Sequence, residues 1–567
     1  MASITGKTHL FFVTSPRSPY KMRDEIKVLV ENFSGQKWER NRQLQVDFYK
    51  QLADEPFFTG TSTGELDFKA RDRITRAPKA LGLVNLSPKI ELTDAGHAYV
   101  YGNRPSEIFT RQLLKFQMPS PFHVDKGSTF FVRPYLELLR LVSDLETLSK
   151  DEIAAFVTQL VHISKYDEVK RKIEQFRAEV AQLDRNKTNY NRYFDEVFSE
   201  QIVAIYTEQI DSGNIQLRES RQATTPQFIR TKKNNHKDYA DAAIRYLRET
   251  GLVSLQNGRS HKIFIPKAKK AEVAFILETV PREPIHIDDT NKYKSYLFDA
   301  ALPALYTDDH QKLVQAVLDL SSRYSQNQLE QLTLEKLKDI KESLIQEQLE
   351  ASLVEQINQL QLYEEYDDIV ATYKEITKRQ VFDAPLMMEW NTWRAFVMLD
   401  DGEVTGNFRL DHTGIPLSTA PGNNPDILCQ YADFDVLVEV TLSSGKRQYE
   451  MEGEPVARHL GEHQKQQEKD AFCIFIAHKL NPATLSQFYM LHQYEVAYYG
   501  GKARIIPLSL SDFQVMLERA YQREAKPTAT TIKQFVEHAS QLAITASNEE
   551  EWYTNIQKLV FNWVEAQ

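Results

Sequence analysis

The sequence predicts a multidomain α+β protein in which helices predominate. The chain has 567 residues, enough for about three or four domains at roughly 150 residues each. It contains only 20 Gly and 22 Pro, which favours long helices over many short strands and turns. Hydrophobic residues make up 42% and charged residues 26%, as in ordinary globular proteins. This composition excludes disordered, collagen-like and disulfide-stapled chains.

Three parts are expected along the chain. Residues 1–280 alternate short helical and strand-like patterns, and the pattern breaks at Pro281 and Pro284. Residues 304–384 then contain neither Gly nor Pro, and their leucines and isoleucines recur at near-helical spacing. We therefore predict a helical linker over 281–375 and an α/β domain over 376–567.

Charge is distributed unevenly between the two halves. Residues 1–280 hold 43 Lys and Arg against 35 Asp and Glu, whereas 281–567 hold 26 against 44. A basic half joined to an acidic half suggests that one part of the chain contacts nucleic acid. The alternative is chance variation combined with a solvated, acidic helical region.

Three segments of the basic half share features of winged helices. Segments 68–96 and 237–266 each read as a helix, then Gly-Leu-Val, then a turn and a strand. Segment 148–180 has a Ser149 N-cap and two apolar-striped helices, as in a helix-turn-helix. A helix that ends at Gly before a small β-ribbon is how a winged helix is built. We predict a winged-helix DNA-recognition domain over 1–280; a protein-interaction module is the alternative.

Two basic clusters in this domain are candidate DNA contacts. The first cluster lies on one short helical run, and the second lies ahead of the second ribbon. Arginine commonly reads guanine with two hydrogen bonds, whereas lysine mainly holds phosphates. The alternative for both clusters is solvated surface. The candidates are Arg71, Arg73, Arg76 and Lys79, and then Lys232, Lys233, Asn234, His236 and Lys237.

The C-terminal part contains an acidic pattern that suggests phosphodiester chemistry. Asp426 follows Pro425, and Glu439 lies 13 residues later in the strand-like run 434–441. This is the PD…E-x-K spacing of restriction-type nucleases, with Thr441 in place of the usual Lys. An acid in a buried strand needs a partner or a metal ion. Mg²⁺ takes oxygen ligands and activates water, so a Mg²⁺ site is expected; a structural ion pair is the alternative.

Further polar residues extend this candidate site. Glu452 lies 13 residues after Glu439, and His459 follows on the same predicted helix. Glu389 lies on a predicted helix over 386–399, beside Trp390 and Trp393, which we interpret as core residues. For His459 the alternative is a helix-surface histidine.

The remaining features indicate a cytosolic protein. The two cysteines, Cys429 and Cys473, cannot form a disulfide framework and are interpreted as buried apolar residues. No window approaches 18 consecutive apolar residues, and the N-terminal apolar run is too short for a secretory signal. We expect a protein without membrane contact.

Several long stretches resemble the AlwI-type family of type IIS restriction endonucleases. The resemblance covers nearly the whole chain and is carried by TSPRSPYKMRDEIKVL, FTRQLLKFQMPSP, APGNNPD, VEVTLSSGKRQYEMEGEPVARH and IIPLSL, among others. It implies a recognition module, a linker and a C-terminal PD-(D/E)xK-type nuclease domain. It also implies Mg²⁺ and a short asymmetric target in double-stranded DNA, of the GAGTC kind, cut a few nucleotides to one side.

The resemblance also assigns roles to matched positions. Asp426 and Glu439 match the metal-binding acids of the family, and Glu452, His459 and Glu389 match further residues of its catalytic site. The family itself carries Thr after Glu-Val, so Thr441 is a family trait.

Two alternatives accompany this expectation. One is a strand-specific nicking endonuclease, as the large subunit of a heterodimer with a small partner subunit; double-strand cleavage would instead need a transient homodimer. The other is a DNA-binding regulator with an inactive nuclease fold, against which the intact acidic set argues. The family implies a bacterial cytoplasmic protein.

Overall fold

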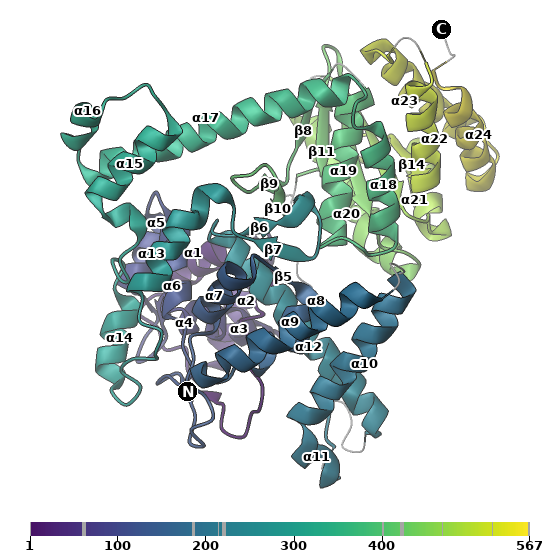
Figure 1. Cartoon of the computed structure of the whole chain (residues 1–567). Coiled ribbons are helices and arrows are strands. Elements are labelled where there is room, and N and C mark those ends of the chain that lie inside the picture. Colours follow the sequence, from purple (N-terminus) through teal and green to yellow (C-terminus); the bar gives the residue numbers. More distant parts are fainter. Residues whose placement is uncertain are drawn as a thin grey trace. The chain divides into compact units, whose positions relative to one another are not determined.

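The computed structural model describes residues 2–58, 64–183, 187–213, 215–217, 223–399, 402–419, 424–467, 469–523 and 526–564. The chain forms two compact units, Met1–Leu344 and Ile345–Gln567. Helices and sheets are both present, with about 60% helix, which confirms the predicted mixed, helix-rich class (Figure 1). Among the described residues no helix is long and apolar enough to cross a membrane.

The predicted linker 281–375 is divided between the two units. Helix α17 (Leu334–Gln361) spans the boundary, and its two ends join different cores. Leu337 and Leu344 pack in a small cluster with Leu313. Leu360, by contrast, belongs to the core of the second unit. The near-helical leucine pattern therefore has two causes, because leucines at the two ends of α17 are buried in different cores.

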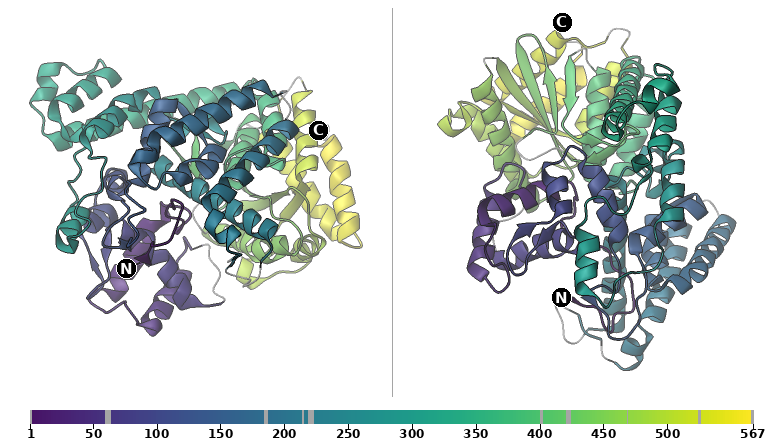
Figure 2. Two further views of the ribbon diagram at one scale, coloured as in Figure 1. Left: turned by 60° about the horizontal axis from the view of Figure 1, so that its bottom comes forward. Right: turned by 90° about the vertical axis from the view of Figure 1, so that its left-hand side faces the viewer.

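The first unit, from residue 1 to 344, is mainly helical with small sheets (Figure 2). Its strands are β1 (Ala2–Ser3), β2 (Val84–Asn85), β3 (Glu91–Leu92), β4 (His123–Val124), β5 (Thr147–Ser149), β6 (Ser254–Leu255) and β7 (Lys262–Phe264). Its helices up to α8 are α1 (Lys21–Phe33), α2 (Arg42–Ala53), α3 (Leu66–Thr75), α4 (Ala77–Ala80), α5 (Asp94–Tyr101), α6 (Pro105–Lys115), α7 (Pro134–Leu145) and α8 (Lys150–Ala155). The later ones are α9 (Tyr166–Gln182), α10 (Lys187–Ile205), α11 (Thr207–Asp211), α12 (Thr225–Glu249), α13 (Lys270–Thr279), α14 (Thr290–Phe298), α15 (His310–Leu320) and α16 (Gln326–Glu330).

Two of the three predicted segments combine into one motif. Strand β5 precedes α8, and β6 and β7 follow α12; together they form an antiparallel sheet in the order β5-β7-β6. Helices α8 and α12 pack against each other, and α9 to α11 are inserted between them in the sequence. Ser149 caps α8 as predicted, accepting a hydrogen bond from the Glu152 backbone at 3.2 Å. Gly251 follows α12 with a φ of 70°, where glycine is favoured.

The other segment, 68–96, also follows its predicted order of helix, glycine and ribbon. Helices α3 and α4 lead to Gly82, and strands β2 and β3 form an antiparallel pair. Gly82 has a φ of 72°, and a Cβ there would lie 2.4 Å from Leu297 Cγ. Both the turn and the close approach of α14 therefore require glycine.

The second unit, residues 345–567, is built on one five-stranded sheet in the order β14-β13-β12-β11-β8. Strands β12, β13 and β14 are parallel, whereas β11 is antiparallel to both of its neighbours. The strands are β8 (Glu403–Gly406), β11 (Ile427–Gln430), β12 (Phe434–Thr441), β13 (Asp470–Ala477) and β14 (Ile505–Ser509), with a separate pair β9 (Arg409–Leu410) and β10 (Pro416–Ser418). The helices are α18 (Tyr366–Thr377), α19 (Ala384–Leu399), α20 (Lys446–Gln466), α21 (Pro482–Gln493), α22 (Leu510–Tyr521), α23 (Ala529–Thr545) and α24 (Glu549–Asn562).

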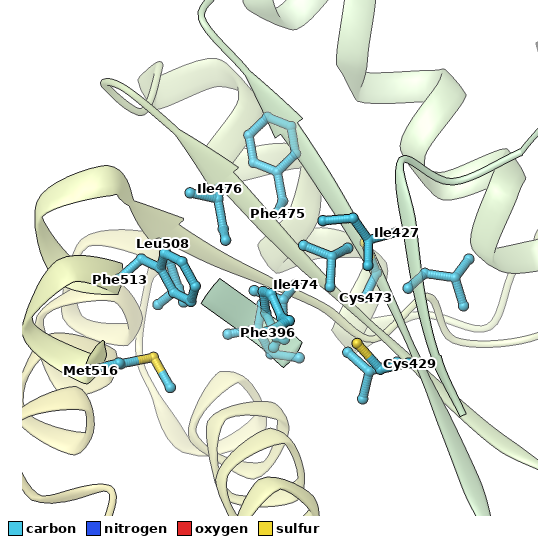
Figure 3. Close-up of a cluster of buried hydrophobic side chains, with 14 of the residues drawn as sticks. Phe396, Ile427, Cys429, Cys473, Ile474, Phe475, Ile476, Leu508, Phe513 and Met516 are labelled. Atoms are coloured by element: carbon cyan, nitrogen blue, oxygen red, sulfur yellow. The ribbon is translucent and has the colours of Figure 1, made fainter. Parts of the chain in front are cut away.

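Helices cover both faces of this sheet. On one face Phe396 of α19 stacks on Phe513 of α22 at 5.3 Å between ring centroids, above Ile474 of β13 (Figure 3). On the other face Phe475 meets Phe488 of α21 at 5.2 Å. Successive strand residues point to opposite faces, which explains this division.

The two cysteines are buried apolar residues, as predicted. Cys429 on β11 and Cys473 on β13 both lie in the sheet core (Figure 3).

Candidate active site and nucleic-acid interface

The site is built where β11 and β12 meet. Ile427 pairs with Val438 in the antiparallel register, so Asp426 comes opposite Glu439. The Val440 backbone N–H donates to Asp426 Oδ2 at 2.8 Å. Sheet register thus brings together two acids that are 13 residues apart in the sequence.

Helix α20 adds two further predicted residues from above this strand. His459 Nδ1 lies 2.7 Å from Glu439 Oε1, and the Thr441 hydroxyl donates to Glu452 Oε1 at 2.7 Å. Glu439 and Thr441 are two residues apart on β12 and therefore share a face, which α20 covers. Glu452 and His459 are seven residues apart, two helical turns, so both point to the strand. The structure therefore links Asp426, Glu439, Glu452 and His459 in one cluster.

The cluster brings three acidic side chains together in a buried place. Burial and the neighbouring Glu439 raise the pKa of Asp426 well above its ordinary value. Burial and Glu452 raise the pKa of Glu439 in the same way, and burial raises that of Glu452. Burial and Arg458 lower the pKa of His459, so its ring is neutral at neutral pH. Acids that the fold holds this close together, with pKa values raised by burial and by one another, are candidates for a functional site.

The same helix–strand interface holds a pair that the sequence analysis missed. Asp435 of β12 is 1% exposed, and its Oδ2 lies 2.9 Å from His463 Nε2. Asp435 is four residues before Glu439 on the same face, and His463 is one turn after His459. Alternation along the strand and the i, i+4 spacing of the two histidines could have identified this pair.

Two glycines let α20 approach its neighbours. A Cβ on Gly461 would lie 2.7 Å from the Tyr499 backbone, whereas a Cβ on Gly453 would meet only the end of the Gln487 side chain. The Tyr499 backbone cannot move aside, whereas the Gln487 side chain can rotate away.

We expect Gly461→Ala to destabilise the protein and Gly453→Ala not to do so. Overpacking at position 461 should cost about 1–3 kcal/mol and lower the cleavage rate by displacing His459. Gly453→Ala should be neutral, or gain up to about 1 kcal/mol from the better helix propensity of alanine. Urea midpoints of the two variants test this, and equal midpoints would contradict the close approach at Tyr499.

Glu389 lies on α19, the helix that packs on β8, β11 and β12. It is 7% exposed, and Trp390 and Trp393 beside it are buried in the core, as predicted. Helix α19 therefore packs on the sheet that carries the acids. The role of Glu389 in the site stays a prediction.

The first basic cluster is engaged with acids of its own unit. Each of its cations has such a partner: Arg71 pairs with Asp67 at 3.0 Å, Arg73 with Glu25, Arg76 with Asp72 at 2.6 Å and Lys79 with Glu39 at 3.6 Å. Glu25 is 1% exposed, and burial raises its pKa to about 7 despite Arg73. Arg73 therefore serves the fold, whereas Arg76 is exposed.

The second cluster divides along α12. His236 is fully buried, with Nδ1 2.9 Å from the Thr158 hydroxyl. Lys233 is 8% exposed and pairs with Asp195. The side chains of His236 and Lys233 therefore make their contacts within the protein. Asn234 is exposed, and Lys237 lies near aromatic rings of α10. Lys232 lines a surface groove together with Arg76 of the first cluster.

Comparison with known proteins assigns the chain to a family. A model of the AlwI restriction endonuclease family matches residues 79–516, most of the chain. The chain belongs to the AlwI restriction endonuclease family. It is accordingly a DNA endonuclease, as the resemblance implied. The match to the AlwI family includes α12 and the whole of the β11–β12–α20 site.

Two solved structures also show similarity to this AlwI-family chain. The small subunit (R.BspD6I2) of the heterodimeric restriction endonuclease R.BspD6I is 27% identical, over 34% of this chain and 98% of that chain, with a TM-score of 0.30. The BpuJ1 endonuclease binding domain, in complex with pyrene- and phenanthrene-modified DNA, is 13% identical over 52% and 97%, with a TM-score of 0.31. No curated protein matches the sequence.

The residues of the AlwI-family site fit Mg²⁺ by the chemistry of their donors. Within the described residues no three His, Cys, Asp or Glu side chains form a ready-made metal cage. Mg²⁺ does not need one, because it binds through one or two carboxylates and completes its shell with waters and substrate phosphate. Asp426 and Glu439 supply such oxygens.

Proposed function

We propose that this AlwI-family chain is a type IIS endonuclease. It binds a short asymmetric duplex site of the GAGTC kind and hydrolyses phosphodiester bonds a few nucleotides to one side, with Mg²⁺. The observation that carries the proposal is the linked set of Asp426, Glu439, Glu452 and His459 in a restriction-endonuclease chain. An inactive regulator would have no need to keep mutually repelling acids together.

The residues of the cluster have distinct proposed roles. Asp426 and Glu439 would hold Mg²⁺, which would lower the pKa of a bound water and neutralise charge developing at phosphorus. His459 orients Glu439 through Nδ1. Thr441 replaces the usual lysine, and its hydroxyl holds Glu452 in place to order the attacking water.

The first unit is proposed to recognise the DNA. The order α7, β5, α8, α12, β6, β7 and the sheet order β5-β7-β6 support a winged helix with an insertion after α8. In such a motif the last helix before the ribbon enters the major groove, and here that helix is α12. The second unit is proposed to be the PD-(D/E)xK-type nuclease domain.

A supercoiled plasmid incubated with the full chain and Mg²⁺ tests the function. We expect linear product, and no change when EDTA removes the metal. Open circles as the only product would favour the strand-specific nicking variant, which would need a small partner subunit to cut both strands. An unchanged plasmid, with retained binding to it in a gel shift, would favour the inactive regulator.

A further inference from the structure

A groove of about 770 Å³ is present in the first unit, lined by the N-terminal part of the chain, by Gln216 and Leu217, and by helix α12. Thr14, Arg17 and Arg76 line it from the N-terminal part of the chain. Residues of α12 at positions 231, 235, 238 and 242 also line it. These positions are three or four apart and so form one helical face. The groove therefore exposes one face of α12 beside a basic wall.

Positive charge at the groove is reinforced by Lys7, which does not line the groove but acts electrostatically on the lining residues Arg76 and Lys232. Partial burial and Arg76 lower the pKa of Lys7, and burial and Lys7 lower the pKa of Lys232. Neither lysine forms an ion pair with any residue that the structure describes. Cations that repel one another on an open surface indicate a site for an anion.

Arg17 is positioned at this groove by a buried carboxylate. Its side chain is 69% exposed, and its Nη2 lies 3.0 Å from Asp241 Oδ2. Asp241 also binds Lys150 at 2.7 Å and Arg245 at 2.8 Å. One buried carboxylate thus faces three cations, and its contact with Arg17 directs that side chain along the groove.

The face of α12 itself has a different character. Asn235 and Asp238 are exposed, and neither makes a side-chain hydrogen bond or ion pair within the described part of the chain. Asp238 would repel a phosphate seated directly on it. Asparagine and aspartate are instead suited to base edges, since asparagine pairs with adenine and aspartate accepts from the cytosine amine. An α-helix is also as wide as the major groove that displays those edges.

We propose that this face of α12 reads base edges in the major groove, with Asn235 and Asp238 as specificity-determining residues and with Arg17, Arg76 and Lys232 on the flanking phosphates. The inference rests on the proposed function and deepens it. It assigns sequence reading to two residues and sequence-independent affinity to three others.

The phosphate contacts are tested by binding measurements on the full chain in EDTA. The probes are a duplex with the wild-type cleavage site, identified by sequencing cut ends, and a duplex without it. We expect Arg17→Ala and Lys232→Gln each to weaken binding to both duplexes by roughly tenfold or more. The slope of log affinity against log salt should fall by about 1. Arg230→Gln is the matched control, because Arg230 is exposed on α12 but does not line the groove.

The base contacts are tested with duplexes that carry single base-pair replacements in the site. Asn235→Ala and Asp238→Asn should weaken binding to the unaltered site by roughly 5- to 150-fold, leave the other duplex unaffected and remove the preference at one position each. Unchanged specificity in both variants, or effects equal to that of Arg230→Gln, would overturn the inference. Failure of the wild-type chain to bind or cut any DNA would instead overturn the proposed function.

Discussion

Replacing Asp426 by alanine is expected to abolish cleavage while leaving specific DNA binding nearly intact. Asp426 is a proposed Mg²⁺ ligand, and a catalytic metal supplies several kcal/mol of charge stabilisation. Its loss should slow cleavage by at least about 10³-fold. The proposed phosphate and base contacts lie in the first unit, so a gel shift in EDTA should still show the target band. Loss of that band in a folded protein would contradict separate recognition and cleavage units.

Asp426→Asn adds a second readout that does not depend on activity. In the metal-free protein the pKa of Asp426 is raised, so its ionised form is disfavoured in the folded state. Stability is then lost as pH rises from the unfolded pKa through the folded pKa. Without metal at pH 8, Asp426→Asn should raise the melting temperature by about 2–4 °C if it relieves about 1 kcal/mol.

The gain from Asp426→Asn should vanish below about pH 4, where the free acid is protonated. The asparagine oxygen can still accept from the Val440 N–H, so the variant keeps the local hydrogen bond. Asp433→Asn is the control, because Asp433 is an exposed acid between β11 and β12 that pairs with Lys533. A lower melting temperature for Asp426→Asn at pH 8 would show that the acids do not repel one another.

Much of the fold could be predicted from local patterns because those patterns determine local structure. The Gly-Leu-Val segments end helices where glycine takes a left-handed conformation, and Ser149 caps α8. What could not be predicted is long-range pairing. Strands β5 and β7 are more than a hundred residues apart, so the sequence could not show that two apparent motifs form one sheet. The linker was likewise ambiguous, since a helical repeat in α17 does not say which core each end enters.

In the candidate site, too, local features could be predicted and long-range contacts could not. A buried acid in a β-strand and its spacing from Pro425-Asp426 were visible in the sequence, and the register of β11 and β12 brings them together. The role of Thr441 was not visible, because it depends on the approach of α20. Among the DNA-binding candidates, charge alone could not separate the half-buried Lys232, which lines the groove, from the buried Lys233 next to it.

Replacing Glu452 by glutamine is expected to slow cleavage more than removing His459. Glutamine keeps the shape and can still accept from the Thr441 hydroxyl, but it lacks the charge that orders the attacking water. The single-turnover rate should fall by roughly 10²–10⁴, the usual contribution of a positioned acid–base group. Glu450→Gln is the matched control, because Glu450 is an exposed acid on the same helix, paired with Lys446 at 3.0 Å.

His459→Ala should cost roughly 10- to 100-fold, as expected for a residue that orients a metal ligand rather than reacting itself. His459 contacts Glu439, and burial together with Arg458 lowers the pKa of His459, so the ring is neutral at neutral pH. If His459 only orients Glu439, higher Mg²⁺ should partly restore the variant's rate, and its pH profile should keep the wild-type shape.

If His459 is the general base, its loss should be as severe as that of Glu452. The wild-type rate should then fall as pH drops through a value below about 6.5, and this inflection should be missing from the variant. Single-turnover rates of both variants across pH and Mg²⁺ concentration decide between these roles, and near-wild-type rates for both would leave the chemistry to the metal and its two ligands alone.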